Sequence, residues 1–148
     1  MPIFEDITEL DAPGKYKIVP DSDSFTDLFL CRLESGSKVL DGAFVLPDGQ
    51  FIVGFSRKCT HMSCYLVSEQ TEESPIKDGL LLCKCHSSCF DLTNRGLPVI
   101  GPATDCLASV ELKAGGNPNE VEIIRWIQDK SVPYGIPYGG TTAKPNGV

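Results

Sequence analysis

Short apolar or alternating runs recur along the chain and are separated by glycine, proline, aspartate and asparagine. These runs cover residues 16–19, 28–33, 43–46, 51–55, 80–82, 107–112 and 121–127. Their length and their turn-rich borders are typical of β-strands. Pro47-Asp48-Gly49-Gln50 and the stretch 115–119 predict hairpin turns between two pairs of these runs. Because no run longer than about ten residues follows the period of a helix, the pattern predicts an all-β fold with few and short helices.

Composition narrows the class of protein. A chain of 148 residues corresponds to one domain. With a formal net charge of −7 and no cluster of lysine and arginine, nucleic acid is not an expected partner. No stretch approaches the roughly 18 apolar residues that a membrane-spanning helix needs. Residues 1–6 have neither the basic region nor the apolar core of a signal peptide. The stretch 131–148 is rich in proline and glycine and predicts a surface tail.

Each of the two histidines of the chain stands beside cysteines. They occur in Cys59-Thr60-His61 and in Cys83-Lys84-Cys85-His86. Thiolate and imidazole ligands suit zinc or iron–sulfur chemistry, whereas calcium and magnesium prefer oxygen. Ligands only two or three positions apart require loops. Because predicted strands stand on both sides of the motifs, we expect a β base made of residues 1–55 and 106–130, with a loop-built metal-binding subdomain, about 56–105, inserted into it.

The complete motifs resemble those of a known family. They are Cys59-Thr60-His61-Met62-Ser63-Cys64, then Cys83-Lys84-Cys85-His86-Ser87-Ser88-Cys89-Phe90-Asp91, then Gly101-Pro102-Ala103. In this order they resemble the two cluster-binding loops and the proline loop of Rieske 2Fe–2S proteins. The resemblance implies a single Rieske domain over residues 1–130, folded as an antiparallel β sandwich that binds one 2Fe–2S cluster.

The resemblance also assigns roles to individual residues. Cys59 and Cys83 would bind one iron, and His61 and His86 the other. The resemblance also implies a disulfide between Cys64 and Cys85. It implies that five further residues lie next to the cluster: Met62, Ser88, Phe90, Gly101 and Pro102. In the family, the Ser88 position donates a hydrogen bond to a cluster sulfide. Phe90 replaces a tyrosine that donates to a ligand sulfur in high-potential members, so we expect a lower potential here.

Two features place the chain within the family. The predicted disulfide is typical of the cytochrome bc-type and arsenite oxidase branch, and the run Gly101-Pro102-Ala103-Thr104-Asp105 resembles the arsenite oxidase small subunit. The spacer between His61 and Cys83 is longer than is usual in that branch, and we expect its extra part, residues 69–78, to form a surface loop. Cys31, Cys89 and Cys106 remain, and each is expected to be a small buried apolar residue.

The predicted function is electron transfer by a subunit that catalyses nothing alone. Its partners would be a larger redox subunit, either a molybdopterin oxidoreductase or a cytochrome b, and an acceptor such as a c-type cytochrome. The disulfide favours a periplasmic or other extracytoplasmic location. One alternative is the quinol-oxidising subunit of a cytochrome bc-type complex.

The remaining alternatives fit the sequence less well. A structural zinc module has the same ligand types but a different spacing. A thiol enzyme would pair Cys59 or Cys85 as nucleophile with His61 or His86 as base. A Rieske oxygenase would need further histidines for a second iron, and the chain has none to offer.

Overall fold

The structure is a computed structural model that describes residues 3–22, 25–35, 42–58, 65–67, 75–83, 88–93, 96–100 and 107–127. Every regular element in these ranges is a β-strand, and all strand pairs are antiparallel. No helix of the described ranges could cross a membrane. The prediction of an all-β antiparallel fold is therefore confirmed.

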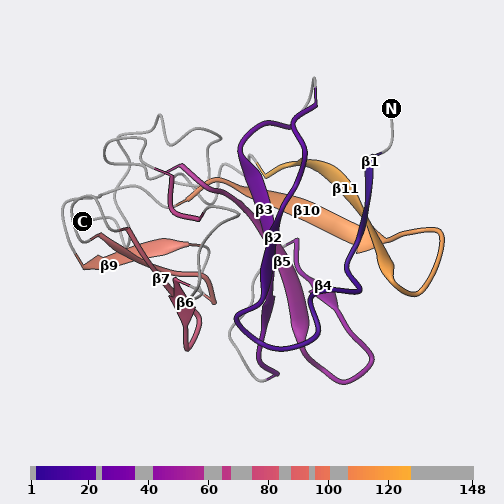
Figure 1. Cartoon of the computed structure of the whole chain (residues 1–148), viewed down its shortest axis with the longest axis horizontal. Coiled ribbons are helices and arrows are strands. Elements are labelled where there is room, and N and C mark those ends of the chain that lie inside the picture. Colours follow the sequence, from indigo (N-terminus) through magenta and orange to yellow (C-terminus); the bar gives the residue numbers. More distant parts are fainter. Residues whose placement is uncertain are drawn as a thin grey trace.

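A large sheet contains seven of the described strands (Figure 1). Its strands are β1 (Ile3–Asp6), β2 (Tyr16–Ile18), β3 (Leu28–Leu33), β4 (Phe44–Val45), β5 (Phe51–Ser56), β10 (Ser109–Ala114) and β11 (Glu120–Trp126). They follow the order β1-β11-β10-β5-β3-β2, with β4 also paired to β5. In Figure 1 strand β10 passes behind the purple strands, and apolar side chains of β10 and β11 pack with those of β3 and β5 in one cluster.

A small sheet lies beside the large one and is drawn on the left of Figure 1. Its strands are β6 (Ile76–Lys77), β7 (Leu80–Leu82), β8 (Cys89–Asp91) and β9 (Leu97–Ile100), in the order β6-β7-β8-β9. In the chain, this sheet falls between β5 and β10 of the large sheet. The predicted boundaries of the inserted subdomain, about 56–105, stay a prediction.

Both predicted hairpins are present. The turn after β4 has Gly49 at φ 88°, a left-handed conformation that suits glycine, and the amide of Gly49 donates to the carbonyl of Leu46 over 2.9 Å. The turn between β10 and β11 is closed by the amide of Gly115, which donates to the carbonyl of Glu120 over 2.9 Å. These turns set the register of the strand pairs that they join.

A third hairpin was not predicted. Asp78 (φ 53°) and Gly79 (φ 79°) form a two-residue connection between β6 and β7, with Lys77 paired to Leu80. Two successive residues with positive φ define the turn type that matches the twist of a hairpin, and Asp-Gly is a favoured pair for it. The surface-loop prediction for residues 69–78 is therefore wrong at its end, where Ile76 is buried in a strand.

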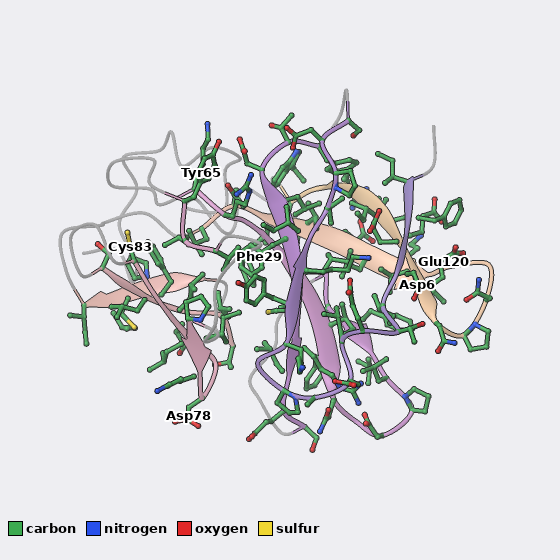
Figure 2. The ribbon with its side chains drawn as sticks, in the orientation of Figure 1. Asp6, Phe29, Tyr65, Asp78, Cys83 and Glu120 are labelled. Carbon is green, nitrogen blue, oxygen red and sulfur yellow. The ribbon has the colours of Figure 1, made fainter. Side chains whose placement is uncertain are left out.

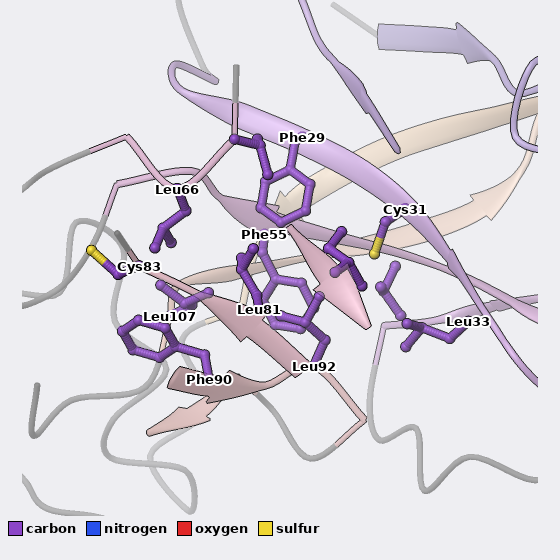
Figure 3. Close-up of a cluster of buried hydrophobic side chains, with 13 residues drawn as sticks. Phe29, Cys31, Leu33, Phe55, Leu66, Leu81, Cys83, Phe90, Leu92 and Leu107 are labelled. Atoms are coloured by element: carbon purple, nitrogen blue, oxygen red, sulfur yellow. The ribbon is translucent and has the colours of Figure 1, made fainter. Parts of the chain in front are cut away.

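The two central strands of the large sheet are covered on both faces. On one face of β3 and β5, Phe29 and Phe55 join a cluster that includes residues of the small sheet (Figure 3). On the opposite face, Leu28, Leu30 and Ile52 pack in a second cluster with side chains of β10 and β11. Successive residues of a strand point to opposite faces, so burial on both faces explains why β3 is an unbroken apolar run apart from Arg32.

We call the first of these clusters the shared core. Its buried members are Phe29, Cys31, Leu33, Val53, Phe55, Leu66, Val67, Ile76, Leu81, Cys83, Phe90, Leu92 and Leu107. Within it, β7 contributes Leu81, whereas Leu80 and Leu82 on either side are exposed on the other face of the same strand. The shared core therefore joins the small sheet to the large one.

Candidate metal centre

The second motif is the loop of the β7–β8 hairpin. Leu82 pairs with Cys89, and beyond this pair the amide of Cys83 donates to the carbonyl of Ser88 over 2.7 Å. Cys83 and Ser88 therefore close the loop, and both are fully buried. The predicted ligand His86 and the predicted disulfide partner Cys85 lie outside the described residues. The antiparallel pairing thus fixes the two ends of the loop.

The first motif is closed in the same way. Lys58 and Tyr65 form an isolated antiparallel bridge, and the amide of Leu66 donates to the carbonyl of Arg57 over 2.6 Å. Residues 59–64 connect the two sides, and they contain four predicted site residues that lie outside the described ranges: Cys59, His61, Met62 and Cys64. This motif extends directly from β5, because Arg57 follows the last residue of that strand.

The third motif begins where β9 ends. Gly101 and Pro102 lie outside the described residues, and the described chain resumes at Leu107, whose amide donates to the carbonyl of Gly96 over 3.1 Å. Gly96 has φ 69°, and an added Cβ would lie 2.9 Å from Cβ of Leu107. Only glycine fits a position with this backbone angle and this contact.

The ends of the three loops meet over one core. Leu66 follows the first loop, Cys83 begins the second and Leu107 follows the third, and all three belong to the shared core (Figure 3). Figure 2 also shows Tyr65 and Cys83 on the same side of the large sheet. The structure therefore brings together the residues that anchor the three motifs, although the motifs are separated in sequence.

Three of the predicted site residues are described, and all three are fully buried. Cys83, Ser88 and Phe90 have exposed fractions of 0%. In Figure 3 the sulfur of Cys83 points away from Leu107 and from the ring of Phe55. A buried thiol at the end of a tight loop suits a thiolate ligand, and Ser88, whose carbonyl accepts from the amide of Cys83, is a second buried polar residue there. These residues fit an iron–sulfur centre.

The remaining ligands are not placed by the structure. Among the described residues, no three histidine, cysteine or acidic side chains form a metal-binding group. Of the four predicted ligands, Cys83 alone lies in the described ranges. The ligand set Cys59, His61, Cys83 and His86 therefore stays a prediction.

Two further cysteines behave as buried apolar residues. In the described ranges, Cys31 and Cys89 are free thiols, and both are buried. Burial raises the pKa of the Cys31 thiol far above its ordinary value of 9.0. Burial, and then the charge of Asp91, raises the pKa of the Cys89 thiol. The prediction for these two residues is confirmed, and Cys106 lies outside the described residues.

A network of charges surrounds the base of the first loop. Asp27, just before β3, lies 3.9 Å from Nη2 of Arg57 and 3.3 Å from Nζ of Lys58. The guanidinium of Arg57 lies 4.1 Å from the ring centre of Tyr65. None of these residues belongs to a motif that was recognised from the sequence. The available signal was two cations immediately before the first motif and a tyrosine immediately after it.

The sequence model of the Rieske [2Fe-2S] domain family matches residues 26–111. This chain belongs to the Rieske family. The matched range contains the three motifs, strands β3, β4 and β5 and the start of β10 in the large sheet, and the whole small sheet. The cofactor of this Rieske protein is therefore a 2Fe–2S cluster, and the alternative of a structural zinc module is set aside.

Curated relatives agree with this assignment. The "Cytochrome bc1 complex Rieske iron-sulfur subunit" of Streptomyces lividans is 29% identical over 113 residues, which cover 75% of this chain and 59% of the relative. The protein of the same name from Corynebacterium diphtheriae is 34% identical over 58 residues, 39% of this chain and 13% of the relative. The Rieske chain thus spans less than two thirds of these relatives.

A solved structure shows the same fold. The soluble domain of the Rieske protein II of Sulfolobus acidocaldarius aligns with a TM-score of 0.56 and 21% identity. The alignment covers 82% of this chain and 77% of the other. The prediction of a Rieske-type fold is confirmed. The narrower placement in the disulfide-containing branch stays a prediction.

Proposed function

We propose that this Rieske protein carries single electrons between a larger redox subunit and a second acceptor. The observation that carries the proposal is the family match over residues 26–111, a range that contains all four predicted ligands. The fully buried Cys83 at the closed end of the second loop supports it.

The proposed ligands are the thiolates of Cys59 and Cys83 and the imidazoles of His61 and His86. When bound, the cluster supplies one-electron exchange. Two neutral imidazoles in place of two thiolates leave the oxidised centre without net charge, so an added electron brings it to a single negative charge. A four-thiolate centre would go from two negative charges to three, and the smaller charge here makes reduction easier.

The residues around the ligands would adjust this potential. Ser88 is buried beside Cys83, and we propose that its hydroxyl stabilises the reduced centre. Phe90 is buried in the shared core and has no polar atom on its ring. It therefore offers no donor to a ligand sulfur and favours a lower potential than a tyrosine would. We assign Met62, Gly101 and Pro102 to the cover that keeps water from the centre.

We further propose that Cys64 and Cys85 form a disulfide between the first and second loops. In the chain-entropy model, a disulfide that closes a loop of this length raises the free energy of unfolding by about 3 kcal/mol. Disulfides persist in oxidising compartments, so we place the protein in the periplasm or another extracytoplasmic space. Non-reducing mass spectrometry of the holoprotein, with a Cys64→Ser control, tests the bridge.

The identity of the larger partner has two candidates. The Gly101-Pro102-Ala103-Thr104-Asp105 run favours a molybdopterin oxidoreductase of the arsenite oxidase kind. The bc1-complex relatives favour a cytochrome b, in which case the protein would be the quinol-oxidising subunit of a bc-type complex. In either case a c-type cytochrome is a suitable acceptor. Purification of the tagged protein from its own cells, followed by identification of the co-purifying subunit, separates the two candidates.

Spectroscopy of the purified holoprotein tests the central proposal. We expect a red-brown protein that bleaches with dithionite and shows the magnetic resonance signal of a mixed-valence iron pair when reduced. His61→Ala and His86→Ala should each abolish that signal. Cys31→Ala, which changes a buried thiol of the shared core, should retain it. A signal that survives both histidine changes would refute the ligand assignment.

A further inference from the structure

The side chain of Arg57 spans the base of the first loop. On one side, its Nη2 lies 3.9 Å from Oδ1 of Asp27. On the other side, its guanidinium lies 4.1 Å from the ring centre of Tyr65, and its Nη1 donates to the carbonyl of Val67 over 3.4 Å. One cation therefore contacts the residue just before β3 and the segment that leaves the first loop.

The backbone repeats the same connection. The amide of Arg57 donates to the carbonyl of Asp27 over 2.7 Å, and the carbonyl of Arg57 accepts from the amide of Leu66 over 2.6 Å. Asp27 is itself held, because its amide donates to Oδ1 of Asp21 over 3.1 Å. Asp27 has φ 54°, in the left-handed region that aspartate tolerates better than most residues. Arg57 is thus fixed by main chain and side chain at the same point.

The contacts of Arg57 leave one of its hydrogen-bond donors without a partner. Among the described residues, its Nε is buried and has no hydrogen-bond partner, and the side chain is only 20% exposed. An unpaired buried donor costs free energy. Local arrangements that give up stability in this way are expected at functional sites. The contacts that Arg57 makes across the first loop are the functional feature that accompanies this cost.

The charges here do not balance. The carboxylate of Asp27 faces two cations, because Nζ of Lys58 lies 3.3 Å from its Oδ2. Among the described residues, the charged group at the base of the first loop therefore has one positive charge in excess, in a chain with a formal net charge of −7. A positive charge favours the addition of an electron to a neighbouring centre.

We propose that Arg57 is a positioning residue for the 2Fe–2S centre. It holds together the two sides of the loop that carries Cys59 and His61, and its charge stabilises the reduced state. This inference rests on the proposed ligand set. It assigns two separable effects to one residue: retention of iron depends on the contacts, and the midpoint potential depends on the charge.

Variants of the holoprotein separate these effects. Arg57→Gln removes charge and contacts, whereas Arg57→Lys keeps the charge but cannot reach both Tyr65 and Val67. Arg125→Gln is the matched control, because Arg125 is 72% exposed in the large sheet and pairs with Glu111 over 3.1 Å. Each variant is measured for the rate of iron transfer to a chelator and for its midpoint potential by voltammetry.

We expect Arg57→Gln to lose iron about tenfold faster than wild type, from the combined loss of a cation–π contact and an ion pair, and to have a lower midpoint potential. Arg57→Lys should lose iron faster while keeping nearly the wild-type potential. Arg125→Gln should change neither quantity. If Arg57→Gln does not assemble a cluster, Tyr65→Leu replaces it, because Tyr65 is 55% exposed and its change leaves the core intact. We expect Tyr65→Leu to lose iron a few-fold faster than wild type.

The outcomes distinguish the two proposals. A wild-type rate of iron loss in both Arg57 variants, or in Arg57→Lys and Tyr65→Leu where Arg57→Gln assembles no cluster, overturns the role of the Arg57 contacts. A wild-type midpoint potential in Arg57→Gln overturns the role of its charge. A wild-type protein without the mixed-valence iron signal overturns the proposed function instead.

Discussion

Truncation of Leu81 to alanine tests whether the shared core joins the two sheets. Leu81 is fully buried in β7, where it pairs with Ile76 and Phe90 across the small sheet. The change removes three carbon groups at about 0.8 kcal/mol each, and the cavity left behind raises the cost to about 3–4 kcal/mol. In a domain of this size, each kcal/mol lowers Tm by roughly 2–4 °C, so we expect a decrease of roughly 6–16 °C.

Leu82 provides the control, because it is the next residue of β7 but points to the other face and is 46% exposed. Leu82→Ala should lower Tm by less than about 3 °C, since little buried surface is lost. The assay is thermal unfolding of the holoprotein by circular dichroism at one scan rate, with cluster absorbance recorded in parallel. Equal shifts in the two variants, or a Leu81→Ala shift below about 2 °C, would refute a core shared between the sheets.

Three further variants test other parts of the structure. Phe90→Tyr should raise the midpoint potential, because the new hydroxyl can donate to a ligand sulfur. A tenfold preference of this hydrogen bond for the reduced over the oxidised centre corresponds to about 60 mV, and an unchanged or lower voltammetric potential would contradict the prediction. Cys31→Ala should flatten the pH dependence of unfolding above pH 9.0, because the raised pKa keeps the folded thiol neutral while the unfolded thiol ionises. In urea titrations over this pH range, the free energy of unfolding should decrease more steeply with pH in wild type than in Cys31→Ala, by up to about 1.4 kcal/mol per pH unit. Gly54→Val should destabilise the protein by about 1–3 kcal/mol, since even a Cβ would lie 2.5 Å from Val110; wild-type urea midpoints would argue against that contact.

The strands of the large sheet follow from the sequence where the apolar runs are long. β3 and β5 are six residues each and nearly continuous in apolar character, so their type was evident before their partners were known. β8 and β9 were not predicted, for different reasons. β8 is only three residues long and lies inside the ligand motif. β9 contains Pro98, which argues against a strand except at a sheet edge, and β9 is an edge strand.

The motifs predicted loops, but their sequence could not show what holds the loops in place. The pairing of Lys58 with Tyr65 depends on the register between the two segments that residues 59–64 join, and local sequence patterns do not specify that register. The approach of Asp27 to Arg57 depends on the pairing of β3 with β5, which begins at Leu28 and Ser56. Local composition identified the ligand types, whereas tertiary pairing determined the residues that support them.

The turn between β10 and β11 lies on the far side of the large sheet from the small sheet (Figure 1). Pro118 in this turn is exposed and, as a proline, has no backbone N–H that could donate a hydrogen bond within the turn. A linker attached at this position would orient the protein on an electrode with the small sheet facing the solution. The hairpin thus offers a handle for surface immobilisation that leaves the core untouched.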